Sequence, residues 1–216
     1  MLSLQDLTVG FNGVVLFDKL SHEFSASSIT SIRKSQLLDG SSTLLKCCAG
    51  ILAPNDGSVA FKGTNIEELT DQQRFQHLSY CFEAGGMVSL FTIYNNLAMP
   101  LVYHNLYPKR EIEERILHTS EELQISHLLD KEPLQLTDVQ LRLVNLARAL
   151  IVDADAIFID ELQSGMSRQI HDCVVSILRK QADRGKVVVM VTTSGDDDSF
   201  ADQYLSINQG RLRAVS

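Results

Sequence analysis

The chain has 216 residues, of which 44% are hydrophobic and 21% are charged. This composition is typical of a globular protein and excludes wholesale disorder. A chain of this length buries about 70% of the surface that it exposes when unfolded, so it needs no disulfide or metal ion for stability. The formal net charge of -8, from 19 Lys and Arg against 27 Asp and Glu, argues against a general nucleic-acid binder.

The cysteines and the apolar segments exclude two further classes. The sequence contains four cysteines: Cys47, Cys48, Cys81 and Cys173. They form no Cys-x-x-Cys pair and no zinc-ligand spacing. The first residues lack the basic flank and apolar run of a signal peptide. Residues 84–108 carry no Asp, Glu, Lys or Arg, but Gly, Asn and Pro interrupt them, so we expect no membrane helix there. We expect a cytoplasmic protein with one uncharged surface segment.

The N-terminal third is rich in β-formers and turn residues. In chain order, the pattern predicts strands over 2–9, 14–24 and 28–32, a helix over 42–50, a strand over 58–61, a helix over 70–77 and a strand over 78–82. The adjacent cysteines of the first helix are expected to pack as small apolar residues.

The middle of the chain is predicted to be helical, and the last third is predicted to alternate helices with buried strands. Residues from about 83 to 136 read as helical, with Ile112, Ile116 and Leu123 spaced along one helix over 109–123. The last third predicts helices over 137–151 and 169–184, buried strands over 156–159 and 187–191, and a final strand pair within 203–213. Short apolar runs between helices are typical of a parallel α/β sheet.

Three anchors occur in a fixed order along the chain. The run Ser42–Lys46 opens a helix after a Gly-bearing loop, Leu146–Leu150 closes a later helix, and Asp160-Glu161 ends a buried strand. This order and spacing resemble the ATPase subunit (nucleotide-binding domain) of ABC transporters, over nearly the whole chain. A P-loop match by itself has low specificity, so another P-loop ATPase, or a doubly wound fold with chance motifs, is the alternative.

The resemblance implies the fold and its divisions. It implies an α/β protein with a P-loop (RecA-like) ABC ATPase core, an antiparallel β subdomain and an inserted helical subdomain. Residues 1–216 would form a single ABC ATPase-like domain, with the core and β subdomain at about 1–82 and 140–216 and the helical subdomain at about 83–139. Within the family, Phe82–Met87 and Asn96–Leu101 resemble segments of MCE/Mla-type phospholipid transporter ATPases.

The P-loop itself departs from the family pattern GxxxxGK[ST]. Ser35 replaces the first Gly, Ser41 replaces the Lys that would reach the β- and γ-phosphates, and Asp39 adds a negative charge to the loop. The positions that survive are Gly40 and the hydroxyls of Ser42 and Thr43. Two like charges about 4 Å apart repel by about 4 kcal/mol at an effective dielectric constant near 20. We therefore expect ATP binding to be weak or absent.

Two cations precede this loop. Lys34 and Arg33 lie at the end of the expected strand over 28–32. A substitute for the lost Lys must lie within a few ångströms of the phosphates. We expect Lys34 to point away from the nucleotide site, so we expect neither residue to replace that Lys.

The acidic pair is the motif that the chain retains in full. The resemblance implies that Asp160, with the Ser42 hydroxyl, would hold Mg²⁺ and that Glu161 would be the general base for the hydrolytic water. Glu83 stands where the family has a Gln that contacts Mg²⁺ and this water. Without a bound triphosphate these catalytic residues, Asp160 and Glu161, are expected to be vestigial or weak. Phe11 aligns with the aromatic residue that stacks on adenine, although it could equally belong to the core.

The remaining two motifs are also altered. The signature LSGGQ reads Leu136–Gln140 here, so that both glycines are lost and Asp138 adds a carboxylate. Thr137 could mimic the signature Ser, but Thr137 followed by Gln140 predicts a capping box that satisfies the helix end from within. Thr193 stands at the position of the switch His, where it cannot supply a charged contact.

These changes together indicate a degenerate subunit. We expect a non-hydrolysing structural or regulatory component of a membrane transport complex, with phospholipid as the candidate cargo. It would require no cofactor and would bind Mg-ATP at most weakly. Two alternatives stay open: a slow or unconventional ATPase that uses Asp160 and Glu161, and a nucleotide sensor without turnover.

The resemblance also implies partners. An integral-membrane permease subunit would dock on the helical subdomain, at about Glu83 to His104, where the uncharged segment would form either an apolar docking patch or subdomain core. A homodimer, or a heterodimer with another ABC ATPase, is expected. No nucleic acid is. The protein would then be cytoplasmic and peripheral on the inner face of the membrane.

Overall fold

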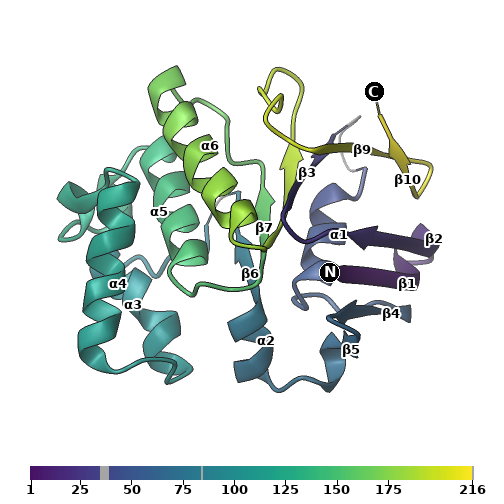
Figure 1. Cartoon of the computed structure of the whole chain (residues 1–216), viewed down its shortest axis with the longest axis horizontal. Helices are drawn as coiled ribbons and strands as arrows, with labels where there is room; N and C mark the ends of the chain where they lie inside the picture. Colours follow the sequence, from purple (N-terminus) through teal and green to yellow (C-terminus); the bar gives the residue numbers. More distant parts are fainter. Residues whose placement is uncertain (35–38, 84, 216) are drawn as a thin grey trace.

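The computed structural model describes residues 1–34, 39–83 and 85–215. Two sheets organise the described residues. A four-stranded antiparallel sheet has the order β2-β1-β4-β5, and a six-stranded sheet has the order β10-β9-β3-β8-β7-β6. In Figure 1 the smaller sheet lies on the right, and the helices from α3 to α6 lie on the left of the larger sheet.

The elements follow the predicted order. The strands are β1 (Leu2–Phe11), β2 (Val14–Phe24), β3 (Ser28–Arg33), β4 (Asp56–Phe61), β5 (Thr64–Asn65), β6 (Leu78–Cys81), β7 (Ala156–Asp160), β8 (Val187–Thr192), β9 (Gln203–Asn208) and β10 (Arg211–Ala214). The helices are α1 (Ser41–Cys48), α2 (Asp71–His77), α3 (Ile93–Tyr103), α4 (Lys109–Glu122), α5 (Asp138–Leu150) and α6 (Arg168–Asp183), with short 3-10 turns η1 (Ile66–Glu68), η2 (Ser126–Leu128) and η3 (Pro133–Gln135).

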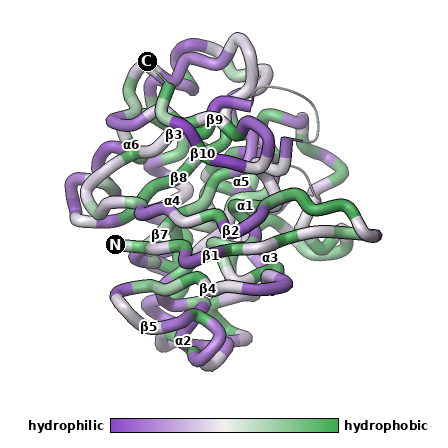
Figure 2. Tube along the Cα trace, turned by 90° about the vertical axis from the view of Figure 1, so that its right-hand side faces the viewer, coloured by the Kyte–Doolittle hydropathy of each residue, from purple (hydrophilic) through white to green (hydrophobic). Residues whose placement is uncertain are grey.

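The centre of the larger sheet is parallel and fully buried. β3, β8, β7 and β6 pair in parallel, and every residue of β7 and β8 is buried. Figure 2 colours β8 as hydrophobic along its length. Strands of this kind read as continuous apolar runs because layers cover both of their faces. The two buried strands expected from the sequence are therefore confirmed.

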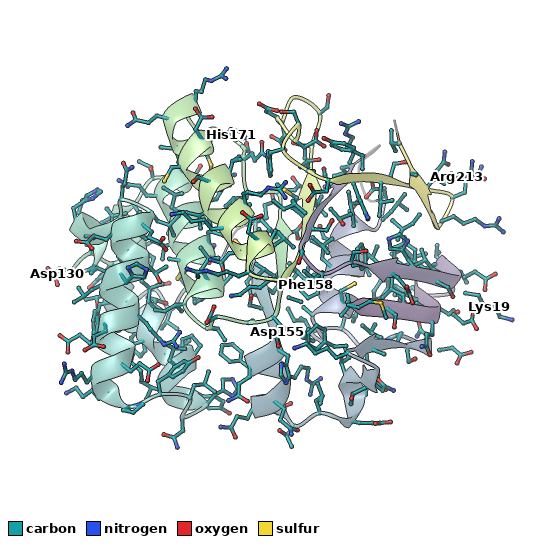
Figure 3. All side chains as sticks on the ribbon, in the orientation of Figure 1. Lys19, Asp130, Asp155, Phe158, His171 and Arg213 are labelled. Carbon is teal, nitrogen blue, oxygen red and sulfur yellow. The ribbon has the colours of Figure 1, made fainter. Side chains whose placement is uncertain are left out.

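The larger sheet separates two hydrophobic clusters. Successive side chains of a strand point to opposite faces, so Ile157 and Ile159 pack with the cluster formed by α3 to α6, whereas Phe158 packs with α1 and the smaller sheet. Figure 3 places Phe158 near the middle of the molecule. Cys47 and Cys48, which are buried in α1, pack in this second cluster, as the sequence predicted.

The uncharged segment contributes to the core of the helical region, and part of it is exposed. On α3, Ile93, Leu97 and Leu101 are fully buried, whereas Val102 and Tyr103 are 61% and 82% exposed. Helix α3 packs against α4 and α5, so one face of this helix is core and the other face is open to solvent.

The expectation of helix from residue 83 onward is wrong for residue 83 and residues 85–92. α3 begins only at Ile93, after Thr92 caps it by accepting a hydrogen bond from Asn95 N at 3.2 Å. The loop before it is organised by Asn96, which is fully buried. Its Oδ1 accepts from Val88 N at 2.7 Å, and its Nδ2 donates to the carbonyls of Val88, Phe91 and Thr92 at 3.1 Å each. A side chain thus replaces the helical backbone bonds that the sequence pattern suggested.

No helix in the described parts of the chain combines the length and the apolar character that crossing a bilayer requires.

Replacing Asn96 should loosen this loop. The Asn96→Ala variant leaves the partly buried Val88 N–H and the carbonyls of the loop without their side-chain partner and removes a fully buried side chain, so we expect a loss of about 2–4 kcal/mol in the free energy of unfolding. Asn95→Ala is the matched control, because Asn95 is exposed and contributes only its backbone N–H to the cap. Urea titration followed by circular dichroism measures both. Equal stability of the two variants would contradict this role.

Candidate functional site

Three chain segments meet at one edge of the larger sheet. β3 ends at Arg33, β7 ends at Asp160, and α1 begins at Ser41. The carboxyl ends of parallel strands share one edge, and ligands of open α/β sheets bind there. Of the predicted nucleotide-binding positions, Gly40, Ser41, Ser42 and Thr43 lie at the start of α1 at this edge, and Ser35 falls outside the described residues.

The N-terminus of α1 is closed by the carboxylate of Asp39. This side chain is 6% exposed, and its Oδ1 accepts a hydrogen bond from Ser41 N at 3.0 Å and another from the Ser41 hydroxyl. Gly40 between them has a φ of 93°, and a Cβ there would lie 2.8 Å from Phe17 Cζ, so this position requires glycine. The N–H groups at a helix start attract anions, and here the chain supplies its own anion.

Asp160 has both carboxylate oxygens engaged. Oδ1 accepts from the Ser42 hydroxyl at 2.9 Å, and Oδ2 accepts from the Tyr80 hydroxyl at 2.8 Å. Asp160 is only 5% exposed. Burial, together with the nearby charge of Asp160, raises the pKa of Tyr80 well above its ordinary range, so the phenol stays protonated and donates.

Tyr80 belongs to this site, although no motif in the sequence pointed to it. In the register of β6 with β7, Tyr80 stands opposite Phe158. Residues i and i+2 of a strand share a face, so Asp160 follows Phe158 on the same side as Tyr80. The alternation of side chains along the expected strand over 78–82 could show which residues share a face with Tyr80. It could not show that this strand pairs with the strand that ends at Asp160.

Lys34 points toward the site, so the expectation that it points away is wrong. Its ammonium group forms an ion pair with Glu161 Oε1. The side chains of Lys34 and Glu161 are 22% and 16% exposed. The hydrogen bond to Glu161 raises the pKa of Lys34, and the charges of Asp39 and Glu83 add to this effect. The four-carbon stem of a Lys lets the charge turn back from the strand end, which its position in the sequence did not reveal.

Three further predicted positions have exposed or partly exposed side chains: Glu83, Phe11 and Thr43. Glu83 is exposed just after β6, as a loop carboxylate. Phe11 is 50% exposed at the end of β1, so the alternative that it belongs to the core is wrong. Thr43 lies in the first turn of α1 and is partly exposed.

The signature-like segment forms the expected capping box. Gln140 N donates to Thr137 Oγ1 at 3.3 Å, and Thr137 N donates to Gln140 Oε1 at 3.0 Å. Asp138 is the exposed first residue of α5, where a carboxylate interacts favourably with the helix dipole. The start of this helix therefore satisfies its own donors, as the sequence predicted.

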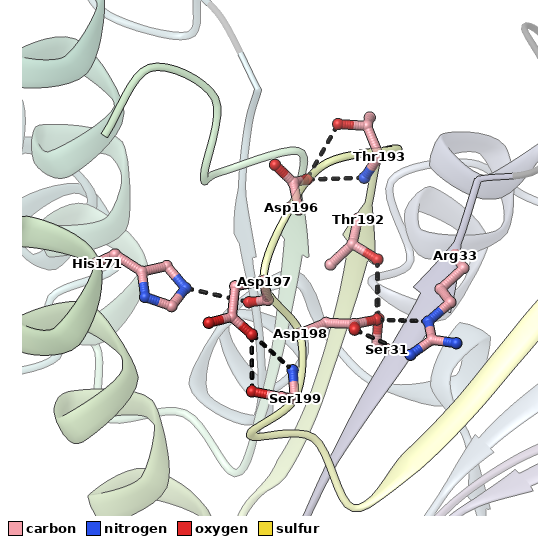
Figure 4. Close-up of polar contacts among 9 residues, drawn as sticks. All are labelled: Ser31, Arg33, His171, Thr192, Thr193, Asp196, Asp197, Asp198 and Ser199. Atoms are coloured by element: carbon pink, nitrogen blue, oxygen red, sulfur yellow. Dashed lines mark hydrogen bonds and ion pairs between the residues drawn. The ribbon is translucent and has the colours of Figure 1, made fainter. Parts of the chain in front are cut away.

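The switch position is tied into the loop after β8. Thr193 donates from both its backbone N, at 2.7 Å, and its hydroxyl, at 3.0 Å, to Asp196 Oδ2. Figure 4 shows this pair above a second carboxylate, Asp198, which faces β3. A side chain at position 193 that bonds within its own loop is not directed toward a separate ligand.

Asp198 holds this loop to the sheet. It is 8% exposed and accepts from Ser31 Oγ at 2.7 Å, from Thr192 Oγ1 at 3.4 Å, and from Arg33 Nε and Nη2 at 2.9 and 3.1 Å. Arg33 also stacks on the ring of Tyr204, with its guanidinium carbon 4.3 Å from the ring centroid. Arg33 is thus committed to structure, in agreement with the expectation that it does not replace the P-loop Lys.

A groove lies at β6, the edge strand of the larger sheet, away from β3 and the Asp198 network. It has a volume of about 480 Å³ and is bounded by the end of α1 and by α2, α3 and α5. Its lining is largely apolar and includes Ile51, Phe75, Phe82 and Met99, with Arg148 as the main cation. Arg148 donates to the carbonyl of Gly86.

The Asp198 network predicts a pH-dependent stability. Burial acts to raise the pKa of Asp198, but the hydrogen bonds from Arg33 and Ser31 outweigh it and hold this pKa below its ordinary value of 3.8. A lowered carboxyl pKa stabilises the folded state above the ordinary value, and this stabilisation is lost as the pH falls through the folded pKa.

We therefore expect Asp198→Asn to lose about 2 kcal/mol of unfolding free energy at pH 7, and the difference from the wild type to shrink below the ordinary carboxyl pKa. Urea titrations at several pH values measure this difference. Asp197→Asn, an exposed neighbour, is the control with a smaller effect. A difference that does not change with pH would show that the charge of Asp198 is unimportant.

Comparisons with known proteins agree with this architecture. The model of the family described as "ABC transporter" matches residues 39–164. The molybdate/tungstate import ATP-binding protein WtpC of Methanocaldococcus jannaschii is 32% identical over 65% of this chain and 46% of its own length. The methionine import ATP-binding protein MetN of Chlamydia pneumoniae is 24% identical over 100% of this chain and 65% of its own. The chain thus spans less than two thirds of these relatives.

Solved structures show the same fold. The dimeric structure of MJ0796, a bacterial ABC transporter cassette, superposes with a TM-score of 0.89 at 21% identity, over 100% of this chain and 98% of that chain. The α/β fold expected from the sequence, with a P-loop ABC ATPase core, is confirmed. The chain belongs to the ABC transporter family, as an ATP-binding cassette.

Proposed function

We propose that this chain is a non-hydrolysing ABC subunit, a structural or regulatory component of a membrane transport complex. The observation that carries the proposal is the closure of α1. Asp39 accepts the hydrogen bond from Ser41 N at the helix start, which in a P-loop protein cradles the phosphates. A carboxylate in that place competes with a phosphate both for the donor and for the space.

The loss of the P-loop cation supports the same conclusion. Ser41 stands at the position of the Lys, and it is 1% exposed with its hydroxyl turned to Asp39. The two preceding cations are engaged elsewhere, Arg33 with Asp198 and Lys34 with Glu161. A bound triphosphate would face the negative charge of Asp39 without an unpaired cation from Arg33, Lys34 or position 41. This arrangement disfavours binding of a triphosphate.

The Mg²⁺ positions, as arranged, do not fit a metal–triphosphate complex. Ser42 and Tyr80 both donate hydrogen to Asp160, so the oxygens that would face a metal face protons. Glu161 is paired with Lys34. A general base must be within hydrogen-bond reach of the proton that it abstracts. Here the Glu161 carboxylate is instead hydrogen-bonded to the Lys34 ammonium group.

The apolar groove is the feature that suits a partner. Ile51 and Met99 line it and are 51% and 37% exposed, and the exposed face of α3 continues beside it. We propose that the groove receives a segment of an integral-membrane permease subunit and that the chain acts as a dimer, with its own copy or with another ABC ATPase. This role would place it at the inner face of the membrane.

The cargo is a separate part of the proposal. The segments Phe82–Met87 and Asn96–Leu101 resemble those of MCE/Mla-type phospholipid transporter ATPases, which favours a lipid. The relatives compared above are named as import proteins for molybdate or tungstate and for methionine. The permease that co-purifies with this chain would distinguish these cargoes.

Calorimetric titration with Mg-ATP tests the loss of nucleotide binding. We expect no heat from the wild type up to millimolar ATP. The Asp39→Asn/Ser41→Lys variant removes the carboxylate charge and restores the ammonium group, so we expect it to bind at least about tenfold more tightly, equivalent to about 1.4 kcal/mol. Asp71→Asn changes an exposed carboxylate at the start of another helix and should behave as the wild type.

Two results would contradict the proposal. One is micromolar binding of Mg-ATP by the wild type. The other is hydrolysis above background that Glu161→Gln abolishes, which would favour the alternative of a slow ATPase. Binding without hydrolysis would favour the nucleotide sensor.

Co-purification tests the docking groove. Membranes that contain the tagged wild-type chain should yield an integral-membrane permease, identified by mass spectrometry. Ile51→Asp and Met99→Asp place a charge in the apolar groove, so we expect each to reduce the recovery of this permease by at least about tenfold. Leu134→Asp is the control, because Leu134 is 85% exposed and lies outside the groove. Equal loss in all three variants, or in none, would argue against docking at this groove.

A further inference from the structure

Four carboxylates lie around this edge of the larger sheet, near the start of α1. Asp160, Glu161, Asp39 and Glu83 come from the ends of two strands and from the flank of α1. Lys34 interacts electrostatically with three of them: with Glu161 through the ion pair, and with Asp39 and Glu83 through their charges. Its ammonium group is thus the cation that these carboxylates share.

We propose that the Lys34 ammonium group takes the place of a divalent metal ion at this edge, so that the charge of Glu161 is compensated without metal or nucleotide. Lys34 is then a positioning residue for Glu161. This inference concerns the proposed non-hydrolysing site and rests on that proposed function.

The chemistry of the site favours an ammonium group over Mg²⁺. Magnesium requires about six oxygen ligands in near-ideal octahedral geometry. Here the Ser42 hydroxyl gives its proton to Asp160, and Tyr80 gives its proton to the other oxygen. Among the described residues, no group of three or more His, Cys, Asp and Glu is arranged to hold a metal ion. An ammonium group needs only carboxylate acceptors, and Glu161 supplies one.

Because the Lys34–Glu161 ion pair is largely shielded from water, each of its charges depends on the other for compensation. The Lys34 and Glu161 side chains are both mostly shielded from water, and Glu161 has a positive φ of 44°. Removing one partner of a shielded ion pair destabilises a protein because the other charge stays without compensation. Without the ammonium group Glu161 has no counter-ion, so a divalent cation that keeps most of its water ligands is attracted to this carboxylate at millimolar concentration, although the described residues form no set of ligands for tight binding.

Manganese binding by the full chain, in the absence of nucleotide, tests this inference. Electron paramagnetic resonance counts free Mn²⁺, and circular dichroism gives the melting temperature with and without the ion. The wild type should neither bind Mn²⁺ nor change its melting temperature. Lys34→Met should melt roughly 5 °C lower, and about 1 mM Mn²⁺ should recover most of this loss.

Three variants serve as controls. Lys34→Arg keeps the positive charge and should not respond to Mn²⁺. Lys109→Met removes the exposed charge at the start of α4 and should match the wild type. The double variant Lys34→Met/Glu161→Gln removes both partners, so it should bind no Mn²⁺ and should melt at a higher temperature than Glu161→Gln alone.

The inference is overturned if the wild type binds Mn²⁺ and Glu161→Gln abolishes that binding, or if Lys34→Met is neither destabilised nor responsive to Mn²⁺. If Lys34→Met does not fold, the comparison of Glu161→Gln with the double variant decides, and a double variant that melts no higher overturns it. Failure of the proposed function is distinguishable, because it appears as ATP binding in calorimetry, whereas these assays contain no nucleotide.

Discussion

Parallel pairing of β3, β8 and β7 is the constraint on which the rest of the structure depends. It brings the ends of strands that are far apart in the chain to one edge, where α1 also begins. Every polar group delivered there must find a partner, because buried charges and donors without partners are costly. The pairs of Lys34 with Glu161, of Ser42 and Tyr80 with Asp160, and of Ser41 with Asp39 are the solutions that this chain adopts.

The same principle of internal satisfaction recurs at the neighbouring motifs. The start of α5 closes on itself through the Thr137 and Gln140 capping box, and Thr193 bonds to Asp196 within the loop after β8. Among the described residues, the side chains at the helix starts of α1 and α5, at Asp160 and Glu161 and at Thr193 bond to other groups of the same chain. The scaffold is thereby kept while the ligand chemistry is replaced, which favours a role in assembly over a role in hydrolysis.

The groove beside β6 shows the opposite tendency. There the chain leaves apolar surface exposed, on Ile51, Met99 and the outer face of α3, although burying it would stabilise the isolated protein. Exposed apolar surface of this kind commonly marks a binding site. The two regions together are the basis of the proposed function, in which the cassette does not bind nucleotide and docks a partner at the groove.

The sequence by itself determined the family, the element order, the two buried strands and the capping box of Thr137, because these depend on local periodicity and spacing. It also showed the altered P-loop residues. The direction of Lys34, the role of Tyr80 and the start of α3 were decided by tertiary structure alone. A flexible Lys follows the charges around it, Tyr80 meets Asp160 only in the register of β6 with β7, and Asn96 competes with a helical backbone only once it is buried. Partners that are remote in the chain determine each of these features, so no local pattern could reveal them.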